Sequence, residues 1–337
     1  MADEKTSKGT LSGAFPVPKG ALLAAVILLI VEFGAARQDW LWDWSGHTPA
    51  GIVAAMDRQV ITPAQPPKVL VMGSSRIRDG VAPRDLESTL GLQQGDVLNV
   101  ALSQGTPKDA LLLYTRHREK FAKASVVVLG LEDWYVNAGY PPTDRQRRNY
   151  TLSERLEGFT SDHYPSLIAG WAWRTYDARR SVKRLAQYVT RGRQRDIKVS
   201  DDGRVVWREE TGDRGPSKIN VARVADRYMG HWKFKTLELE AIKDLEEMVK
   251  ADGSRLMLFQ PPLRNAYIDY VEAEHAKRIN QYRDAIKDLG IEMLFGERGS
   301  DFGLEEELFY DYGHCTPAGA TIITRRLGEW LKAQGVR

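Results

Sequence analysis

The sequence of 337 residues predicts an α/β fold, a doubly wound parallel sheet in three layers. Short β-branched and apolar runs have the length of buried parallel strands. The segments between them carry apolar residues at spacings of three and four, which is typical of amphipathic helices. Several of these segments end near a glycine, as helices commonly do. The strands are expected at Lys68–Met72, Val97–Val100, Ser125–Leu131, Arg255–Gln260 and Ile291–Phe295.

The predicted helices alternate with these strands along the chain. Each presents apolar residues on one face and charges on the other, so each can pack on a sheet. Strand and helix in alternation indicate βα units, which join into a parallel sheet through right-handed crossovers. The helices are expected at residues 83–91, 107–122, 235–251, 267–289 and 317–334, with Gly91, Gly253, Gly290 and Gly335 near their ends.

Composition narrows the functional classes. Hydrophobic residues make up 42% and charged residues 28% of the chain, which is ordinary for a protein with a packed core. The net charge of +3 is too small to indicate nucleic acid as a partner. Cys315 is the only cysteine, so an intramolecular disulfide is impossible and cysteine usage does not indicate a compartment. No motif points to a cofactor or a metal.

An apolar run near the N-terminus predicts a membrane anchor. Gly20–Ala36 holds 17 residues, apolar or small except for Glu32, and Lys19 and Arg37 bracket it. That length is the short limit for crossing a hydrocarbon core of about 30 Å, and Glu32 is expected near the far interface. We therefore expect a transmembrane anchor over residues 20–37. A cleaved signal peptide is the rival interpretation, although Glu32 is unusual so close to a cleavage site.

Lysines set the expected orientation of this anchor. Lys5, Lys8 and Lys19 precede the apolar run, and positive charges favour the cytoplasmic side. Residues 1–19 are therefore expected in the cytoplasm and the rest of the chain outside it. The predicted location is the inner (cytoplasmic) membrane, single-pass, with the domain on the periplasmic or extracellular side. Trp40, Trp42 and Trp44 suit the outer interface of the bilayer.

The remaining chain divides by composition. Pro49, Pro63 and Pro66, with Pro67 directly after them, predict a stalk over residues 38–66 with one short helix, followed by a core of residues 67–138 and 235–337. Residues 139–234 break the strand rhythm, and we interpret them as a helical insertion with a hairpin at Ile197–Glu209. Within it, residues 171–198 hold nine Lys or Arg against two acids. This is either a solvated helix face or a surface for an anionic polymer or anionic lipid.

The first candidate for chemistry follows the first strand directly. Gly73, Ser74, Ser75 and Arg76 come where the carboxyl end of a parallel strand meets the ligand crevice. A turn there presents a hydroxyl and a free backbone N–H, so Ser75 is the candidate nucleophile. A serine at such a turn is also a common helix cap. Arg76 and Arg78 are candidates for binding an anion.

The second candidate precedes the last helix. Asp311 and His314 are three residues apart in a loop, which lets the carboxylate fix the tautomer of the imidazole while its other nitrogen reaches a nucleophile. His314 would be the general base. A structural pair, or two ligands of a metal, are the alternatives. Cys315 as a thiol nucleophile is a weaker alternative, because its side chain is expected to point away from its neighbour His314.

Together these segments resemble the SGNH, or GDSL-like, hydrolase family over residues 68–131 and again from Arg255 to the C-terminus. Gly73-Ser74-Ser75 is similar to the first block, with Ser74 in place of Asp, and Asp311–His314 is similar to the last. Leu98–Gly105 resembles the second block, with Ala101 in place of its first glycine. Gly130-Leu131-Glu132-Asp133 resembles the third, with Glu132 where the family has asparagine.

The resemblance implies a role for each matched residue. Ser75, Asp311 and His314 would form the catalytic triad, and the backbone N–H groups of Ser75 and of Ala101 or Gly105 would form the oxyanion hole. Arg76, Glu132 and Asp133 would contact substrate. Glu132 cannot donate as asparagine does unless it is protonated, so Asn137 or Asn149 is a candidate replacement donor.

The resemblance to membrane-anchored members of this family also implies a function. It indicates an O-acetyltransferase or acetylesterase that acts on an exopolysaccharide or other envelope polymer through an acyl-serine. The expected partners are the membrane, an anionic or neutral polysaccharide and a membrane-bound O-acyltransferase, as in exopolysaccharide acetylation or teichoic-acid D-alanylation. The alternative is a catalytically inactive relative that binds polymer or assists assembly in an envelope complex, and Glu132 is the residue that favours it.

Overall fold

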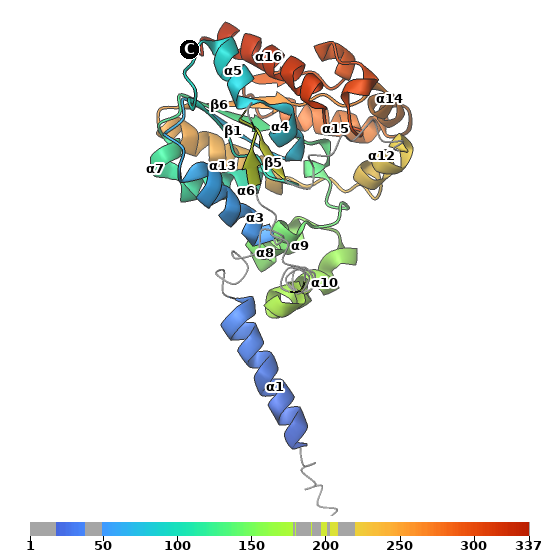
Figure 1. Ribbon diagram of the computed structural model, residues 1–337. Coiled ribbons are helices and arrows are strands. Elements are labelled where there is room, and N and C mark those ends of the chain that lie inside the picture. The colour runs from blue at the N-terminus through green and yellow to red at the C-terminus, as the bar shows by residue number, and fades with distance from the viewer. Residues whose placement is uncertain are drawn as a thin grey trace, which may run out of the picture.

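A computed structural model describes residues 18–37, 49–177, 179, 190, 197–200, 203–207 and 220–336. Its centre is a five-stranded parallel sheet in the order β2-β1-β3-β6-β7 (Figure 1). This confirms the predicted α/β class and its five strands. The strands are β1 (Val69–Met72), β2 (Val97–Asn99), β3 (Val126–Gly130), β6 (Arg255–Gln260) and β7 (Met293–Phe295).

Successive residues of each strand point to opposite faces of the sheet and pack into two separate hydrophobic cores, one on each face. Leu70, Val127 and Leu258 belong to one buried cluster, and their neighbours Val71, Val128 and Met257 belong to the other. The first face is covered by α6 (Pro107–Arg116), α13 (Leu237–Ala251), α14 (Asn265–Glu274) and α15 (Ala276–Lys287). The second is covered by α4 (Ser75–Gly80), α5 (Pro83–Leu90) and α16 (Pro317–Ala333), with α5 and α16 side by side (Figure 1).

Two predicted helices are each broken by a histidine. The helix expected over residues 107–122 ends at Arg116, and α7 (Arg118–Phe121) follows His117. The helix expected over 267–289 divides at His275 into α14 and α15. Both histidines leave the helical conformation, with φ of −112° and −131°. The apolar spacing continues across each break, so it does not reveal the kink.

The expected stalk is partly wrong. Residues Pro49–Met56 form α3, and Asp57–Ile61 continue it as a π-helical turn. Ala55, Met56 and Ile61 are buried in the core on the α6 side of the sheet. This helix is apolar enough to pack against the domain, so these residues are part of the domain and not a spacer.

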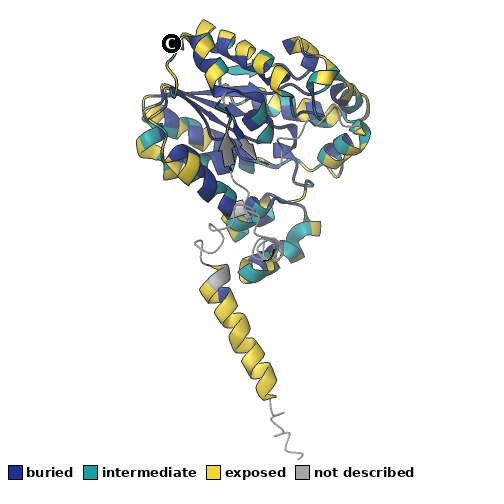
Figure 2. Cartoon of the chain, viewed as in Figure 1, coloured by how far each residue is buried: buried dark blue, intermediate teal, exposed yellow. Residues whose placement is uncertain are grey.

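The N-terminal apolar run forms α1 (Lys19–Val31), continued by a π-helical turn at Glu32–Ala36. Figure 1 shows α1 projecting away from the domain, and Figure 2 shows its surface exposed along its length. None of its residues is buried, and its large side chains include Leu23, Ile27 and Ile30, all more than half exposed. No helix within the described residues has both the length and the apolarity needed to cross a membrane.

The described residues between β3 and β6 are mainly helical. They contain η3 (Asp133–Val136), α8 (Asp144–Asn149), α9 (Leu152–Glu157), α10 (Tyr164–Ala172) and α12 (Val221–Met229). The predicted hairpin is present as β4 (Ile197–Val199) paired antiparallel with β5 (Val205–Trp207). Trp40, Trp42, Trp44 and most of the basic stretch 171–198 lie outside the described residues.

Candidate active site

The turn between β1 and α4 presents Ser75 at the carboxyl edge of the sheet. Gly73 has φ +141°, and a Cβ there would lie 2.9 Å from the Ile77 side chain and 3.2 Å from the Gly130 backbone. Only glycine fits this close approach without strain. Ser74 caps α4, because its side chain accepts a hydrogen bond from the Arg76 N–H. Ser75 itself is only partly buried, and its hydroxyl is not needed for the cap.

The loop before α16 brings His314 to this serine. The distance from Ser75 Oγ to His314 Nε2 is 2.8 Å, and from His314 Nδ1 to the nearer Asp311 carboxylate oxygen it is also 2.8 Å. Asp311 Oδ1 additionally accepts the backbone N–H groups of Gly313 and His314. The structure thus brings the three predicted triad side chains into one hydrogen-bonded chain. This geometry suits a nucleophile, a base and a group that orients the base.

The pKa values in this chain follow from burial and pairing. Burial lowers the pKa of His314, but the hydrogen bond and charge of Asp311 outweigh it, so the net pKa lies above the ordinary value of 6.5. For Asp311 burial raises the pKa, and the hydrogen bonds from His314 and Gly313 outweigh it and lower the net value. Asp311 therefore remains charged where His314 titrates. Asp79 and Arg78 also act on His314, in opposite directions.

This pairing predicts the pH dependence of any activity. His314 must be neutral to accept the serine proton, so kcat/KM is expected to rise with pH through a midpoint above 6.5. Asp311→Asn removes the charge that stabilises the imidazolium, so the midpoint should fall and kcat should drop on the order of 10³–10⁴-fold. Ester hydrolysis by both proteins measures this. A wild-type profile that stays flat from about pH 5 to pH 9 would contradict the role of His314.

The structure corrects the predicted roles of Arg76, Glu132 and Asp133. All three are buried, with 2%, 2% and 1% of their surface exposed, so a direct substrate contact does not fit them. Glu132 forms an ion pair with Arg76 and accepts a hydrogen bond from the Ser74 hydroxyl. Asp133 accepts from the Tyr267 hydroxyl at 2.8 Å, and burial raises its pKa to about 6. Glu132 therefore stabilises the serine turn through its contacts with Ser74 and Arg76.

The predicted oxyanion hole also needs correction. The Ala101 N–H donates to the Asn99 side chain at 3.1 Å, and the Gly105 N–H donates to the Leu102 carbonyl at 2.8 Å. Neither is free to bind an oxyanion. The Ser75 N–H, by contrast, has no partner within the described part of the chain.

The candidate replacement donors Asn137 and Asn149 are occupied elsewhere. The Asn137 amide donates to the carbonyls of Tyr228 and Gly230, and that of Asn149 points to Asp109.

A neighbouring turn contains another unpaired backbone donor. Gln104 is exposed and has φ +53°, a conformation that is strained for a residue with a side chain. Its turn lies against the serine turn, because the Leu102 N–H donates to the Gly73 carbonyl at 2.9 Å. The Gln104 N–H has no hydrogen-bond partner among the described residues. Strain of this kind is often found at functional sites.

Arg78, which was expected to bind an anion, and Arg145, which no motif in the sequence singled out, hold this turn. Arg78 donates to the Ser103 hydroxyl at 2.6 Å and pairs with Asp79 at 2.7 Å. Arg145, at the start of α8, donates to the Ser103 carbonyl and pairs with Asp109 at 3.0 Å. Arg145 comes from the insertion, so no local motif links it to the turn. The insertion therefore helps to fix the geometry of the site.

Cys315 is not positioned as a nucleophile. It is 2% exposed and packs in the core on the α16 side of the sheet. Burial raises the pKa of its thiol well above the ordinary value. The described residues also contain no cluster of three or more His, Cys, Asp or Glu able to hold a metal.

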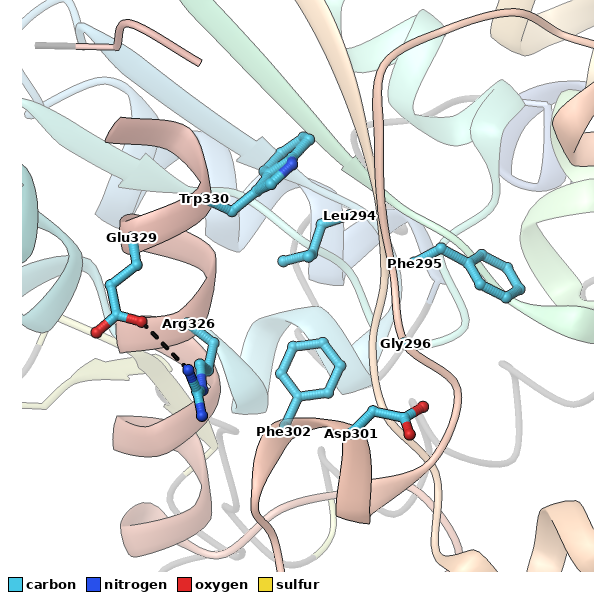
Figure 3. Close-up of a pocket in the computed structure, with 8 residues that line it drawn as sticks. All are labelled: Leu294, Phe295, Gly296, Asp301, Phe302, Arg326, Glu329 and Trp330. Carbon is cyan, nitrogen blue, oxygen red and sulfur yellow. Dashed lines mark ion pairs between the residues drawn. The ribbon is translucent and has the colours of Figure 1, made fainter. Parts of the chain in front are cut away.

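One open pocket of about 350 Å³ lies elsewhere, beside the edge strand β7. Figure 3 shows Leu294 and Phe302 in it, with Trp330 from the C-terminal half of α16. Arg326 and Glu329 form an exposed ion pair at its rim, 3.6 Å apart. No triad residue lines this pocket, so it is separate from the candidate active site.

No protein-family model matches the sequence, and no curated protein matches it. Among solved structures, a GDSL-like lipase from Bacteroides thetaiotaomicron is similar over 83% of this chain and 96% of its own, with 14% identity and a TM-score of 0.35. An alpha/beta hydrolase enzyme from the metagenome of Lake Arreo is similar over 81% and 97%, with 12% identity and a TM-score of 0.37. At identities and TM-scores this low, neither protein's activity transfers to this chain.

Proposed function

We propose that this chain is a serine acyl-transfer enzyme that forms an acyl-Ser75 intermediate. The observation that carries the proposal is the hydrogen-bonded chain from Ser75 through His314 to Asp311, at 2.8 Å for each link. Its acyl group is acetyl, and its acceptor is a hydroxyl of an exopolysaccharide or other envelope polymer. Its proposed anchor in the inner membrane is the exposed apolar helix α1 together with the turn Glu32–Ala36 that continues it, with the domain outside the cytoplasm.

The proposed reaction has two balanced halves. His314 takes the proton of the Ser75 hydroxyl, and the serine oxygen bonds to the ester carbonyl carbon. The bond to the donor alcohol breaks, and that alcohol leaves with the proton from His314. A sugar hydroxyl or water then loses its proton to His314 and attacks the acyl carbon. The bond from that carbon to the Ser75 oxygen breaks, and His314 returns the proton to this oxygen. The N–H groups of Ser75 and Gln104 stabilise the oxyanion in both halves.

Transfer to a sugar and hydrolysis use the same residues, so an assay must separate them. The full-length protein in detergent micelles, given p-nitrophenyl acetate and a neutral or acidic oligosaccharide, is expected to release nitrophenol and acetylate the sugar. Mass spectrometry of the sugar measures transfer, and nitrophenol absorbance measures total turnover. Nitrophenol release without sugar acetylation would assign the chain as an esterase.

A second candidate function is an anchored, non-catalytic polymer-binding subunit. It is favoured by the missing side-chain amide at position 132 and by the occupied N–H groups of Ala101 and Gly105. The same assay distinguishes it. Folded wild-type protein that turns over no faster than Ser75→Ala, yet retains the oligosaccharide in equilibrium dialysis, would support this subunit and contradict the enzyme.

A further inference from the structure

Helix α10 has an apolar outer face. None of its nine residues, Tyr164–Ala172, carries a charged side chain. Leu167 and Gly170 are buried against the domain, whereas Ile168 and Trp171 are each 44% exposed. A helix on a water-facing surface normally turns charged residues outwards. Contiguous exposed apolar residues therefore indicate a surface that another phase or molecule covers.

This face adjoins the end of α1. Glu32 is fully buried, and its carboxylate accepts the backbone N–H groups of Arg174 and Thr175, each at 2.8 Å. It also accepts from the Thr175 hydroxyl, and Arg37 donates to the Ala172 carbonyl at 3.2 Å. These bonds fix the C-terminal end of α10 to the turn that ends α1. The exposed apolar surface of α1 and the exposed side chains Ile168 and Trp171 of α10 therefore lie on either side of one junction.

Among the residues that the structure describes, two positive side chains face outwards at this junction. Arg37 and Arg179 are exposed, and each guanidinium lies over an aromatic ring, 5.0 Å from that of Phe33 and 3.8 Å from that of Tyr176. Asp177 points inwards and pairs with Arg155 at 3.0 Å. The exposed Asp162 lies before the opposite end of α10. Cationic and aromatic side chains together suit an anionic headgroup region.

We propose that the outer face of α10 rests on an anionic lipid surface, with Ile168 and Trp171 at the headgroup boundary and Arg37 and Arg179 against lipid phosphates. This rests on the proposed anchoring by α1 and adds a second point of membrane contact. One contact leaves a domain free to tilt, whereas two fix its orientation.

The orientation matters for the active site. The Arg174 side chain donates to the Arg148 carbonyl at 3.2 Å, and Arg148 lies on α8. Three residues earlier on α8, Arg145 donates to the Ser103 carbonyl, in the turn beside Ser75. A short chain of contacts thus links the lipid-facing junction to the catalytic edge of the sheet.

Site-specific labelling of the full-length protein tests the contact. Ile168 or Trp171 is replaced with a single cysteine, which is labelled with an environment-sensitive fluorophore. Each labelled protein is reconstituted in vesicles of phosphatidylglycerol and phosphatidylcholine that contain a nitroxide-labelled lipid. Phe295→Cys is the matched control, because Phe295 is 42% exposed on β7. Ile27→Cys in α1 reports insertion of the anchor. Cys315 is buried and is changed to serine to prevent labelling.

The expected result is at least about twofold quenching at positions 168 and 171, as at position 27, and little at position 295. Quenching at 168 and 171 should weaken when phosphatidylcholine replaces phosphatidylglycerol. If position 27 is quenched while 168 and 171 are not, the lipid contact is wrong but the anchor stands. If position 27 is not quenched, the proposed anchoring by α1 is wrong, and the proposed lipid contact of α10, which rests on it, is wrong as well. If the cysteine at position 171 is protected from labelling in native membranes but not in the lipid vesicles, a protein partner covers this face. That result would overturn the lipid contact.

Discussion

Replacing Ser75 with alanine is expected to lower ester hydrolysis by roughly 10³–10⁶-fold, because the substitution removes the atom that forms the acyl-enzyme. The fold should be unaffected. Ser75 is partly exposed, and the helix cap of α4 comes from Ser74. Initial rates with p-nitrophenyl acetate, measured beside thermal unfolding in the same detergent, separate lost chemistry from lost structure.

Ser88→Ala provides the matched control, since Ser88 is an exposed helical serine on α5 outside the site. It should leave rate and Tm unchanged. His314→Gln should resemble Ser75→Ala, because residues that act as one unit lose activity together. Wild-type turnover in the Ser75→Ala protein would mean that another group is the nucleophile.

Replacing Glu132 with alanine is expected to destabilise the protein by about 3–5 kcal/mol, because it leaves Arg76 buried without its partner. The side chains of Arg76 and Glu132 are only 1% and 3% exposed. Ser74 loses a hydrogen-bond acceptor in the same variant, so the serine turn should also loosen and activity should fall. Denaturant unfolding of the full-length protein measures the free energy.

Two further variants sharpen this prediction. Glu292→Ala removes an exposed ion pair with Arg255 and should cost at most about 1 kcal/mol. The double variant Arg76→Met, Glu132→Leu removes both buried charges and should recover most of the stability lost in Glu132→Ala. If Glu132→Ala is as mild as Glu292→Ala, the buried pair does not support the turn as described.

The sheet was predictable because its strands are buried on both faces. Runs such as Val126–Gly130 are apolar at every position, which few structures other than a central parallel strand require. The breaks at His117 and His275 were not predictable from the spacing of apolar residues, which continues across them. The packing of α3 depends on a hydrophobic surface that the distant strands create, so the prolines around it suggested a stalk instead.

The candidate site was predictable to a different degree at each residue. Ser75, Asp311 and His314 lie in short motifs at element ends, and the structure brings them into contact, although their catalytic role stays a prediction. The environment of Glu132 depends on Arg76, which is distant in sequence, so charge alone suggested a substrate contact. The type of a residue does not reveal whether its backbone N–H is free to act as a donor, as that of Gln104 is. The hydrogen-bond partners of a backbone group are known only once the fold is known.

The most direct test is to treat the folded, full-length protein with a fluorophosphonate and locate the adduct by peptide mass spectrometry. We predict a single phosphonylated site at Ser75, absent in Ser75→Ala and much slower to form in His314→Gln. The Ser88→Ala protein should label at the wild-type rate. An unlabelled wild-type protein, or an adduct on any other residue, would contradict the proposal that Ser75 is an activated nucleophile.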